Sequence, residues 1–198
     1  YGEPELESNK IETQNLEKLQ TINSKNYYLI NSLDEIDKWI EEAEEVGEVA
    51  VDTETTSLDP HQADLVGISL CSKIGKACYI PIGHKSPKCL KKDAVIKKLK
   101  KILEDPSIKK IGQNIKFDFI VFYKCGITLS SMEDTMLMSY VLDAGKNRHN
   151  MDTLSEIHLG HKTISFKDMV GTGKKEINFS EVELDKAKDY AAEDADVT

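Results

Sequence analysis

Short apolar runs, each bounded by polar or turn residues, predict most of the strands of this chain. YYLI at 27–30 and VAVDT at 49–53 are rich in β-branched and aromatic residues, which favour strands. Residues 63–72 (ADLVGISLCS) and 77–82 (ACYIPI) predict two more, and the KIGK turn between them favours an antiparallel pair. KKIGQ at 109–113 predicts a further short strand. The strands are therefore concentrated in the first part of the chain.

Between these runs, and over most of the chain that follows them, the spacing of apolar residues predicts helices. Ser32 and Glu35 form an S-x-x-E capping box that opens a helix through about Val46, which Gly47 ends. Residues 90–105 predict an amphipathic helix with a lysine-rich outer face. Further helices are predicted directly after 113, near 133–143, at 151–159 and at about 181–198, with a less regular stretch at about 160–180. Because strands come first and helices alternate later, we expect an α/β fold with a mixed central sheet.

Length and composition narrow the class of protein. The 198 residues suit one domain with a real core, which we place at 27–198, and the polar residues 1–26 predict a linker or lead-in segment. No apolar run approaches the ~18–20 residues that span a bilayer, and no secretory signal opens the chain. The four cysteines show no CxxC spacing, so we expect reduced thiols in a cytoplasmic protein without a membrane anchor.

The net charge of −9 disfavours simple electrostatic binding of nucleic acid, which depends on Lys and Arg. Bound metal ions could supply positive charge locally, but the affinity for an extended polyanion would stay modest. The lysines at 88–110 predict a solvated face, with weak guidance of DNA as the alternative.

Four acids and one tyrosine carry the candidate chemistry. Asp52 and Glu54, in VAVDTETTSLD, lie on the same side of a strand because strand side chains alternate. Tyr190 and Asp194 are four residues apart and share one helical face. Asp118 follows a short strand in IGQNIKFDF. Each segment alone also fits a turn acid, a helix cap or a surface acid. If they converge, the crowded carboxylates need positive charge, and oxygen ligands favour Mg²⁺ or Mn²⁺.

Taken together, these segments resemble the motifs of the DEDDy 3′–5′ exonucleases, which are named for four acids and a tyrosine. The similarity is greatest to the proofreading exonuclease domains of family A polymerases, the bacterial DNA polymerase I group, and covers roughly 27–198. Histidine-type relatives carry a His five residues before the last acid, where this chain has Asp189, so Tyr190 makes it the tyrosine type. The matching segments are DTETTSLD, ADLVGISL, ACYIPIGH, IGQNIKFD, EDTMLMSYVLD, RHNMDTLSE, HKTISF and YAAEDADVT.

The resemblance implies a ribonuclease H-like fold and hydrolysis of DNA from its 3′ end with two divalent metal ions, Mg²⁺ or Mn²⁺. Asp52, Glu54 and Asp194 would hold the ion that activates water, and Asp52 with Asp118 would hold the ion that stabilises the leaving oxygen. Tyr190 would orient the water. A polymerase domain would follow in the same polypeptide, acting in the cytoplasm at the nucleoid. The alternatives are a catalytically silent scaffold or single-strand-binding module, and a ribonuclease D-like RNA exonuclease.

The same resemblance implies a set of residues that contact the single-stranded DNA end. Leu58 would wedge against the terminal base and Phe166 would stack near it, with core packing as the alternative for both. Phe117 departs from the tyrosine found in a related protein, which affects one hydroxyl contact and not the chemistry. The remaining candidates for substrate binding are Gln113, Asn114, Arg148 and Met151.

Overall fold

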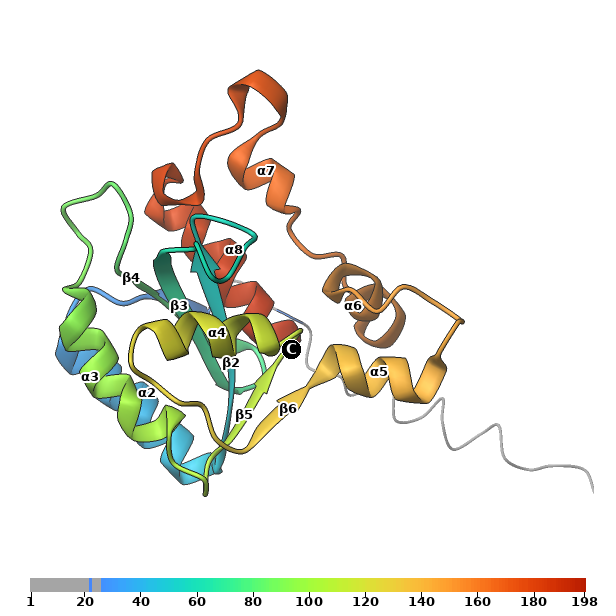
Figure 1. Ribbon diagram of the computed structural model, residues 1–198, viewed down its shortest axis with the longest axis horizontal. Helices are drawn as coiled ribbons and strands as arrows, with labels where there is room; N and C mark the ends of the chain where they lie inside the picture. Colours follow the sequence, from blue (N-terminus) through green and yellow to red (C-terminus); the bar gives the residue numbers. More distant parts are fainter. Residues whose placement is uncertain (1–21, 23–25) are drawn as a thin grey trace, which may run out of the picture.

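A computed structural model describes residue 22 and residues 26–198. The predicted linker at 1–26 therefore lies almost entirely outside the described residues. Within the described part, one mixed sheet of six strands forms the centre of the protein, in the order β1-β4-β3-β2-β5-β6 (Figure 1). The strands are β1 (Tyr27–Leu29), β2 (Glu48–Thr55), β3 (Leu65–Lys73), β4 (Lys76–Pro81), β5 (Lys109–Gly112) and β6 (Met132–Asp134).

The pairing of the strands confirms the prediction of a mixed sheet. Strands β2, β3 and β4 are joined by antiparallel ladders, as the KIGK turn indicated for β3 and β4. Strand β5 pairs parallel with β2, β6 pairs parallel with β5, and β1 pairs parallel with β4 at the opposite edge. The central strand β2 is thus supported on both sides, and its last residues are those that carry the first acidic motif.

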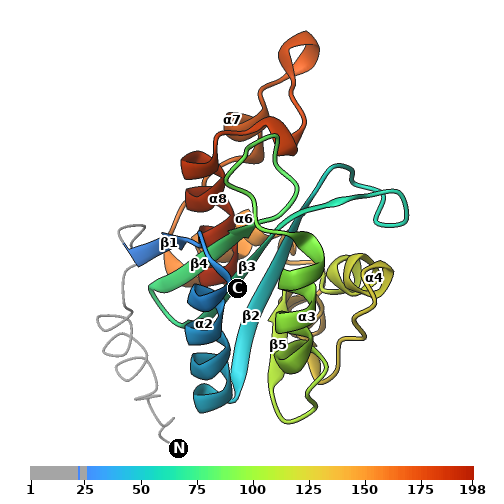
Figure 2. The same cartoon turned by 90° about the vertical axis from the view of Figure 1, so that its left-hand side faces the viewer.

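Helices cover both faces of this sheet. Helices α2 (Leu33–Val46) and α3 (Lys92–Leu103) pack against each other over one face, and α8 (Leu184–Val197) lies across the other (Figure 2). Helix α4 (Lys116–Lys124) lies beside β2. The remaining helical segments are α5 (Thr135–Asp143), α6 (Met151–Leu159), α7 (Phe166–Val170) and the short 3-10 turns η4 (Gly173–Lys175) and η5 (Phe179–Glu181).

The alternation of side chains along β2 divides its residues between the two faces. Val49 and Val51 belong to the large core under α2 and α3, whereas Ala50 packs with Ala192 and Ala195 of α8. Small alanine side chains on both elements allow α8 to lie close to the sheet. The period of two therefore places Asp52 on the side that faces α8.

The boundaries predicted from the sequence hold for most elements. The Ser32 hydroxyl accepts a hydrogen bond from the backbone N–H of Glu35 at 3.3 Å, and Gly47 ends α2 in the left-handed conformation. The helix predicted near 133–143 was wrong at its start, because residues 132–134 form strand β6. The Asp134 carboxylate caps α5 by accepting from two backbone N–H groups of its first turn. A three-residue strand has no periodic signal of its own, so only its parallel pairing with β5 reveals it.

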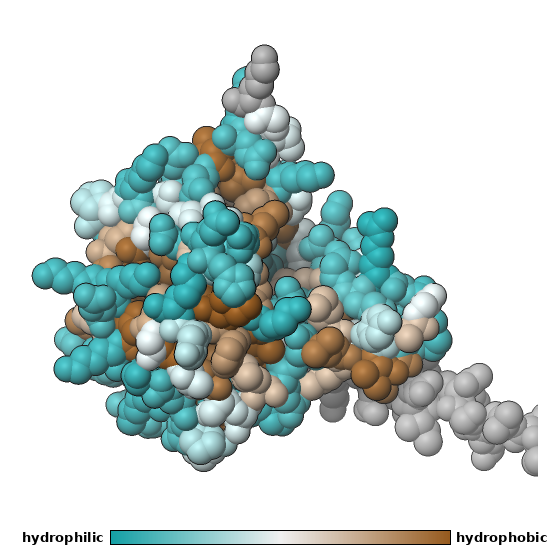
Figure 3. Space-filling view, viewed as in Figure 1, coloured by the Kyte–Doolittle hydropathy of each residue, from teal (hydrophilic) through white to brown (hydrophobic). Residues whose placement is uncertain are grey.

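Helix α5 is the one α-helix of the described residues that buries no side chain. It has no buried residue, and the side chains of Leu137, Val141 and Leu142 are 57%, 81% and 79% exposed. The space-filling view shows apolar side chains gathered where α5 lies (Figure 3). Within the residues that the structure describes, no helix is long and apolar enough to cross a membrane.

Candidate active site

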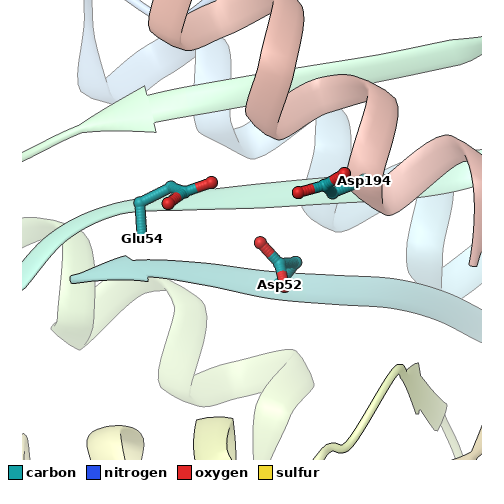
Figure 4. Close-up of side chains that lie close together, drawn as sticks. All are labelled: Asp52, Glu54 and Asp194. Carbon is teal, nitrogen blue, oxygen red and sulfur yellow. The ribbon is translucent and has the colours of Figure 1, made fainter. Parts of the chain in front are cut away.

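Three carboxylates meet in the space between β2 and α8. Asp52 and Glu54 project from β2, and Asp194 projects from α8 toward them (Figure 4). One carboxylate oxygen of each acid lies within 4.8 Å of the corresponding oxygens of the other two. The structure thus brings together the first and last acidic segments, as the resemblance implied.

The fourth acid, Asp118, approaches the same place from α4. Its carboxylate oxygen Oδ1 accepts hydrogen bonds from the backbone N–H and the hydroxyl of Thr53, at 3.0 Å and 2.6 Å. Thr53 stands between Asp52 and Glu54 on β2 and points to the opposite side of the strand. Asp118 is therefore not a member of the three-acid cluster, although burial and, after it, the negative charge of Asp52 raise its pKa.

Burial and mutual repulsion shift the acids toward their protonated forms. Burial raises the pKa of Asp52 to about 6. Burial, reinforced by the charge of Asp52, also raises the pKa values of Glu54, Asp118 and Asp194 well above their ordinary range. None of the ion pairs among the described residues involves any of these four acids. A cluster of buried carboxylate oxygens without cationic side chains fits hard divalent cations.

Tyr190 lies one turn before Asp194 on the same face of α8. Burial raises the pKa of its hydroxyl further above an already alkaline ordinary value, and the carboxylates of Asp194, Glu54 and Asp52 add to this effect. The hydroxyl therefore keeps its proton at neutral pH, so it is suited to donate a hydrogen bond and not to act as a base.

A cavity of about 530 Å³ opens above the acids and connects them to the surface. Leu58, Phe117 and Phe166 line it together with the carboxylates and Tyr190. Leu58 is 91% exposed, which excludes core packing as its role. Phe166 is 41% exposed and its ring lies parallel to that of Phe179, with centroids 6.1 Å apart. The cavity thus combines an acidic floor with apolar and aromatic walls.

The other predicted substrate-binding residues lie outside this cavity. Gln113 and Met151 line a separate cavity beside α5 and α6. The side-chain amide of Gln113 donates to the carbonyl of His149 at 2.7 Å and accepts from the hydroxyl of Thr135 at 2.6 Å, so its hydrogen-bonding groups are already engaged.

Asn114 and Arg148 do not line the cavity above the acids either. Asn114 has φ of 58°, and its backbone N–H donates to Asp134. Arg148 is an exposed residue of the segment between α5 and α6. The DNA contacts of these four residues stay predictions.

Two residues that shape the site were missed from the sequence. Thr53 holds Asp118, and its position inside the D-x-E motif was the available signal. Asn178 donates from its side chain to the carbonyl of Thr56 at 2.9 Å and so joins two walls of the cavity. No local pattern indicates that contact, because the partners are 122 residues apart.

Comparisons with known proteins agree with this geometry. Residues 27–198 match a family described as 3′-5′ exonuclease. DNA polymerase I of Rhizobium leguminosarum is 45% identical over 194 residues, and DNA polymerase I of Pseudomonas aeruginosa is 46% identical over 168 residues. The alignments cover 87% and 82% of this chain but 19% and 18% of those polymerases. The chain thus spans about a fifth of the length of the curated relatives it matches.

Solved structures share the fold. NrnC of Brucella melitensis matches with a TM-score of 0.63 and 26% identity, over 86% of this chain and 74% of that chain. NrnC with bound Mg²⁺ has a TM-score of 0.58 and 27% identity, over 76% and 67% of the two chains. RNase D of Trypanosoma brucei has a TM-score of 0.70 over 88% and 55%, but its 15% identity shows the fold alone. These likenesses confirm the ribonuclease H-like arrangement predicted from the sequence.

Proposed function

The chain belongs to the 3′-5′ exonuclease family represented in bacterial DNA polymerase I, and from this membership we propose that it removes nucleotides from the 3′ end of single-stranded or frayed DNA. The family and the nuclease class predicted from the sequence are confirmed. The substrate, the metal count and the individual roles below are our proposal. One observation carries it: the carboxylates of Asp52, Glu54 and Asp194, the first half-buried and the other two buried, form the floor of a cavity with aromatic walls, and a fourth carboxylate lies beside them.

The four acids fit two divalent ions, Mg²⁺ or Mn²⁺. Asp52, Glu54 and Asp194 would hold one ion, and Asp52 with Asp118 would hold the other. Such ions lower the pKa of bound water and neutralise charge on the phosphate and the leaving oxygen. The chemistry of the donor set supports this assignment, because all four side chains offer only oxygen and none has a cationic partner among the described residues. NrnC, a structural neighbour, has been solved with Mg²⁺.

The protein's own side chains orient the reacting groups. Tyr190 keeps its hydroxyl proton and would donate a hydrogen bond to the attacking water or to a phosphate oxygen. Thr53 donates two hydrogen bonds to one oxygen of Asp118, so the other oxygen of that carboxylate would be the one that holds the ion. Leu58 and Phe166 would hold the terminal bases apart, since a stacked base contributes ~1–3 kcal/mol of binding.

The shape and charge of the protein support a single-stranded or frayed 3′ end as the substrate. An acidic floor reached between apolar walls accepts unstacked nucleotides, so a paired end must first melt. The net charge of −9 supports only modest affinity for the rest of the strand. We therefore propose that a polymerase domain of the same polypeptide, as in the relatives, delivers the 3′ end, and that the protein acts on chromosomal DNA in the cytoplasm, at the nucleoid.

The test compares single-stranded DNA and RNA of one sequence, both labelled at the 5′ end, in Mg²⁺, Mn²⁺ or EDTA. We expect stepwise shortening of DNA from the 3′ end, release of 5′-monophosphates and no reaction in EDTA. Blunt duplex should be degraded more slowly, and a mismatched terminal pair should restore the rate.

Two outcomes contradict the proposal. Preferential shortening of RNA would favour the ribonuclease D-like alternative. Oligonucleotide binding without cleavage in either metal would favour the silent module. The presence of Asp52, Glu54, Asp194 and Tyr190 at one cavity supports the active enzyme over the silent module, and so does Asp118, which Thr53 holds beside them.

A further inference from the structure

Glu193, next to Asp194 on α8, is a buried carboxylate with no part in the acid cluster. The residue is only 5% exposed. Its Oε1 lies 2.8 Å from Nε2 of His161, and its Oε2 accepts the backbone N–H of Ile164 at 2.6 Å. Both oxygens are thus bound to one short segment, residues 160–165, which connects α6 to α7 and runs beside α8 (Figure 1).

The same segment is fixed at its other side to α6. Ser155 donates from its hydroxyl to the carbonyl of His161 at 2.9 Å. Thr163 donates from its hydroxyl to Asp152 at 2.7 Å. Residues 160–165 have no regular secondary structure of their own. These side-chain hydrogen bonds to α6 and α8 therefore hold the segment in position.

What this segment positions is Phe166, the first residue of α7. The Phe166 ring lies 6.0 Å from the ring of Tyr190 and 6.1 Å from that of Phe179, on the wall of the catalytic cavity. Ile164, whose N–H is held by Glu193, is only two residues before Phe166. A shift of the segment away from α8 would therefore displace an aromatic wall of the cavity while leaving the acids on β2 in place.

We propose that Glu193, with His161 as its partner, is a positioning residue. By holding residues 160–165 against α8, it determines where the 3′-terminal nucleotide binds. The inference rests on the proposed function in one respect, namely that Phe166 contacts the nucleotide. Glu193 touches neither substrate nor the reacting atoms, so its effect passes through Phe166. The Glu193–His161 pair thus couples the helix that carries Asp194 to the aromatic wall beside that helix.

The chain offers a matched control on the same helix. Asp196 is also buried, and it lies as near to Asp194 in the chain as a control requires: Glu193 precedes Asp194 by one residue, and Asp196 follows it by two. The Asp196 carboxylate accepts from the hydroxyl of Tyr27 at 2.8 Å and from the backbone N–H of Gly75 at 2.6 Å. Those partners lie on β1 and in the turn between β3 and β4, away from the cavity. Asp196→Asn therefore perturbs a comparable buried contact of α8, and none of the hydrogen bonds that the Asp196 carboxylate accepts among the described residues comes from residues 160–165.

The experiment measures kcat and KM on a short single-stranded DNA with Mg²⁺, together with hydrogen exchange of residues 160–166. We expect Glu193→Ala to raise KM ~10-fold, to change kcat less than ~3-fold, and to accelerate exchange in this segment. Glu193→Gln, which keeps an oxygen acceptor for Ile164, should recover most of the effect. Asp196→Asn should leave both KM and the exchange of this segment unchanged.

A double-mutant cycle tests the route through Phe166. Because Glu193 acts on binding by placing that ring, Glu193→Ala combined with Phe166→Ala should raise KM no more than Phe166→Ala alone, within ~2-fold. Additive effects, a loss confined to kcat, or unchanged hydrogen exchange would overturn the inference. If the parent protein cleaves no DNA, the proposed function fails, and exchange together with oligonucleotide binding still decides whether Glu193 holds the segment.

Discussion

Asp118 is held by Thr53, the residue that separates the two acids of the D-x-E motif. The Thr53 hydroxyl and backbone N–H both donate to one oxygen of Asp118, at 2.6 Å and 3.0 Å. The alternation of β2 thus serves both sides of the strand: Asp52 and Glu54 point toward α8, and the residue between them anchors the acid that comes from α4. The position of the fourth acid is consequently tied to the position of the first two.

Thr53→Val tests this link, because valine has nearly the shape of threonine without its hydroxyl. The backbone hydrogen bond at 3.0 Å remains, so we expect the fold to persist. Loss of an outer partner of a metal-binding carboxylate typically weakens metal binding ~10- to 100-fold, and we expect a value at the lower end. Titration calorimetry with Mn²⁺ measures it, with Thr55→Val as the control, since the Thr55 hydroxyl donates to the carbonyl of Ser57. Equal affinities of the two variants would contradict the prediction.

The double substitution Asp52→Asn and Glu54→Gln should abolish cleavage. Both amides keep the size of the parent side chains, but they lack the negative charge that holds a divalent cation. We expect a loss of at least ~10³-fold in the rate of 3′-end shortening, with an unchanged far-ultraviolet circular dichroism spectrum. Metal-dependent shortening at the parent rate by this variant would show that another set of residues performs the reaction.

The same variant should change how stability depends on pH in EDTA. The pKa of Asp52 is raised to about 6 in the folded state, so its contribution to stability is present below its ordinary pKa and is lost as the pH rises through about 6. The raised pKa of Glu54 acts in the same direction. Since one pKa unit corresponds to ~1.4 kcal/mol, the stability of the variant relative to the parent should increase by ~1–3 kcal/mol between about pH 4 and pH 7. Urea unfolding at several pH values measures this, and a constant difference would refute it.

Tyr190→Phe should cost less than the loss of a metal-binding acid. It removes one hydroxyl that donates a hydrogen bond and leaves all four carboxylates in place. Positioning groups of this kind typically contribute ~10- to 10³-fold, and we expect turnover to fall within that range. Single-turnover cleavage of labelled single-stranded DNA separates this effect from product release. A rate equal to that of the parent would show that the hydroxyl has no role in the reaction.

Those parts of the site that follow from local periodicity could be predicted from the sequence. Two acids at i and i+2 on a strand, and a tyrosine and an acid at i and i+4 on a helix, lie where the geometry of each element places them. The resemblance added the expectation that the segments meet, and Asp52, Glu54 and Asp194 do meet. The mixed sheet and most of its helices were predictable for the same reason.

Contacts between distant segments could not be predicted in this way. Thr53 and Asp118 are 65 residues apart, and His161 and Glu193 are 32 residues apart, so no periodic pattern links them. Strand β6 is too short to show an alternation and exists because β5 offers it a parallel neighbour. The surroundings of Gln113 also depend on distant residues, because its side chain donates to the backbone carbonyl of His149 and lines a cavity beside α5 and α6.

The apolar surface of α5 has a consequence for the behaviour of the protein in concentrated solution. Helix α5 carries a strip of apolar side chains that are exposed to solvent and are not covered by any other described residue; the strip includes Leu137, Val141 and Leu142. Salts that are excluded from protein surfaces strengthen the association of such strips. The central sheet is buried and therefore takes no part in this association. Folded molecules would therefore associate through α5 and precipitate without unfolding. Turbidity would then limit the usable protein concentration before the central sheet unfolds.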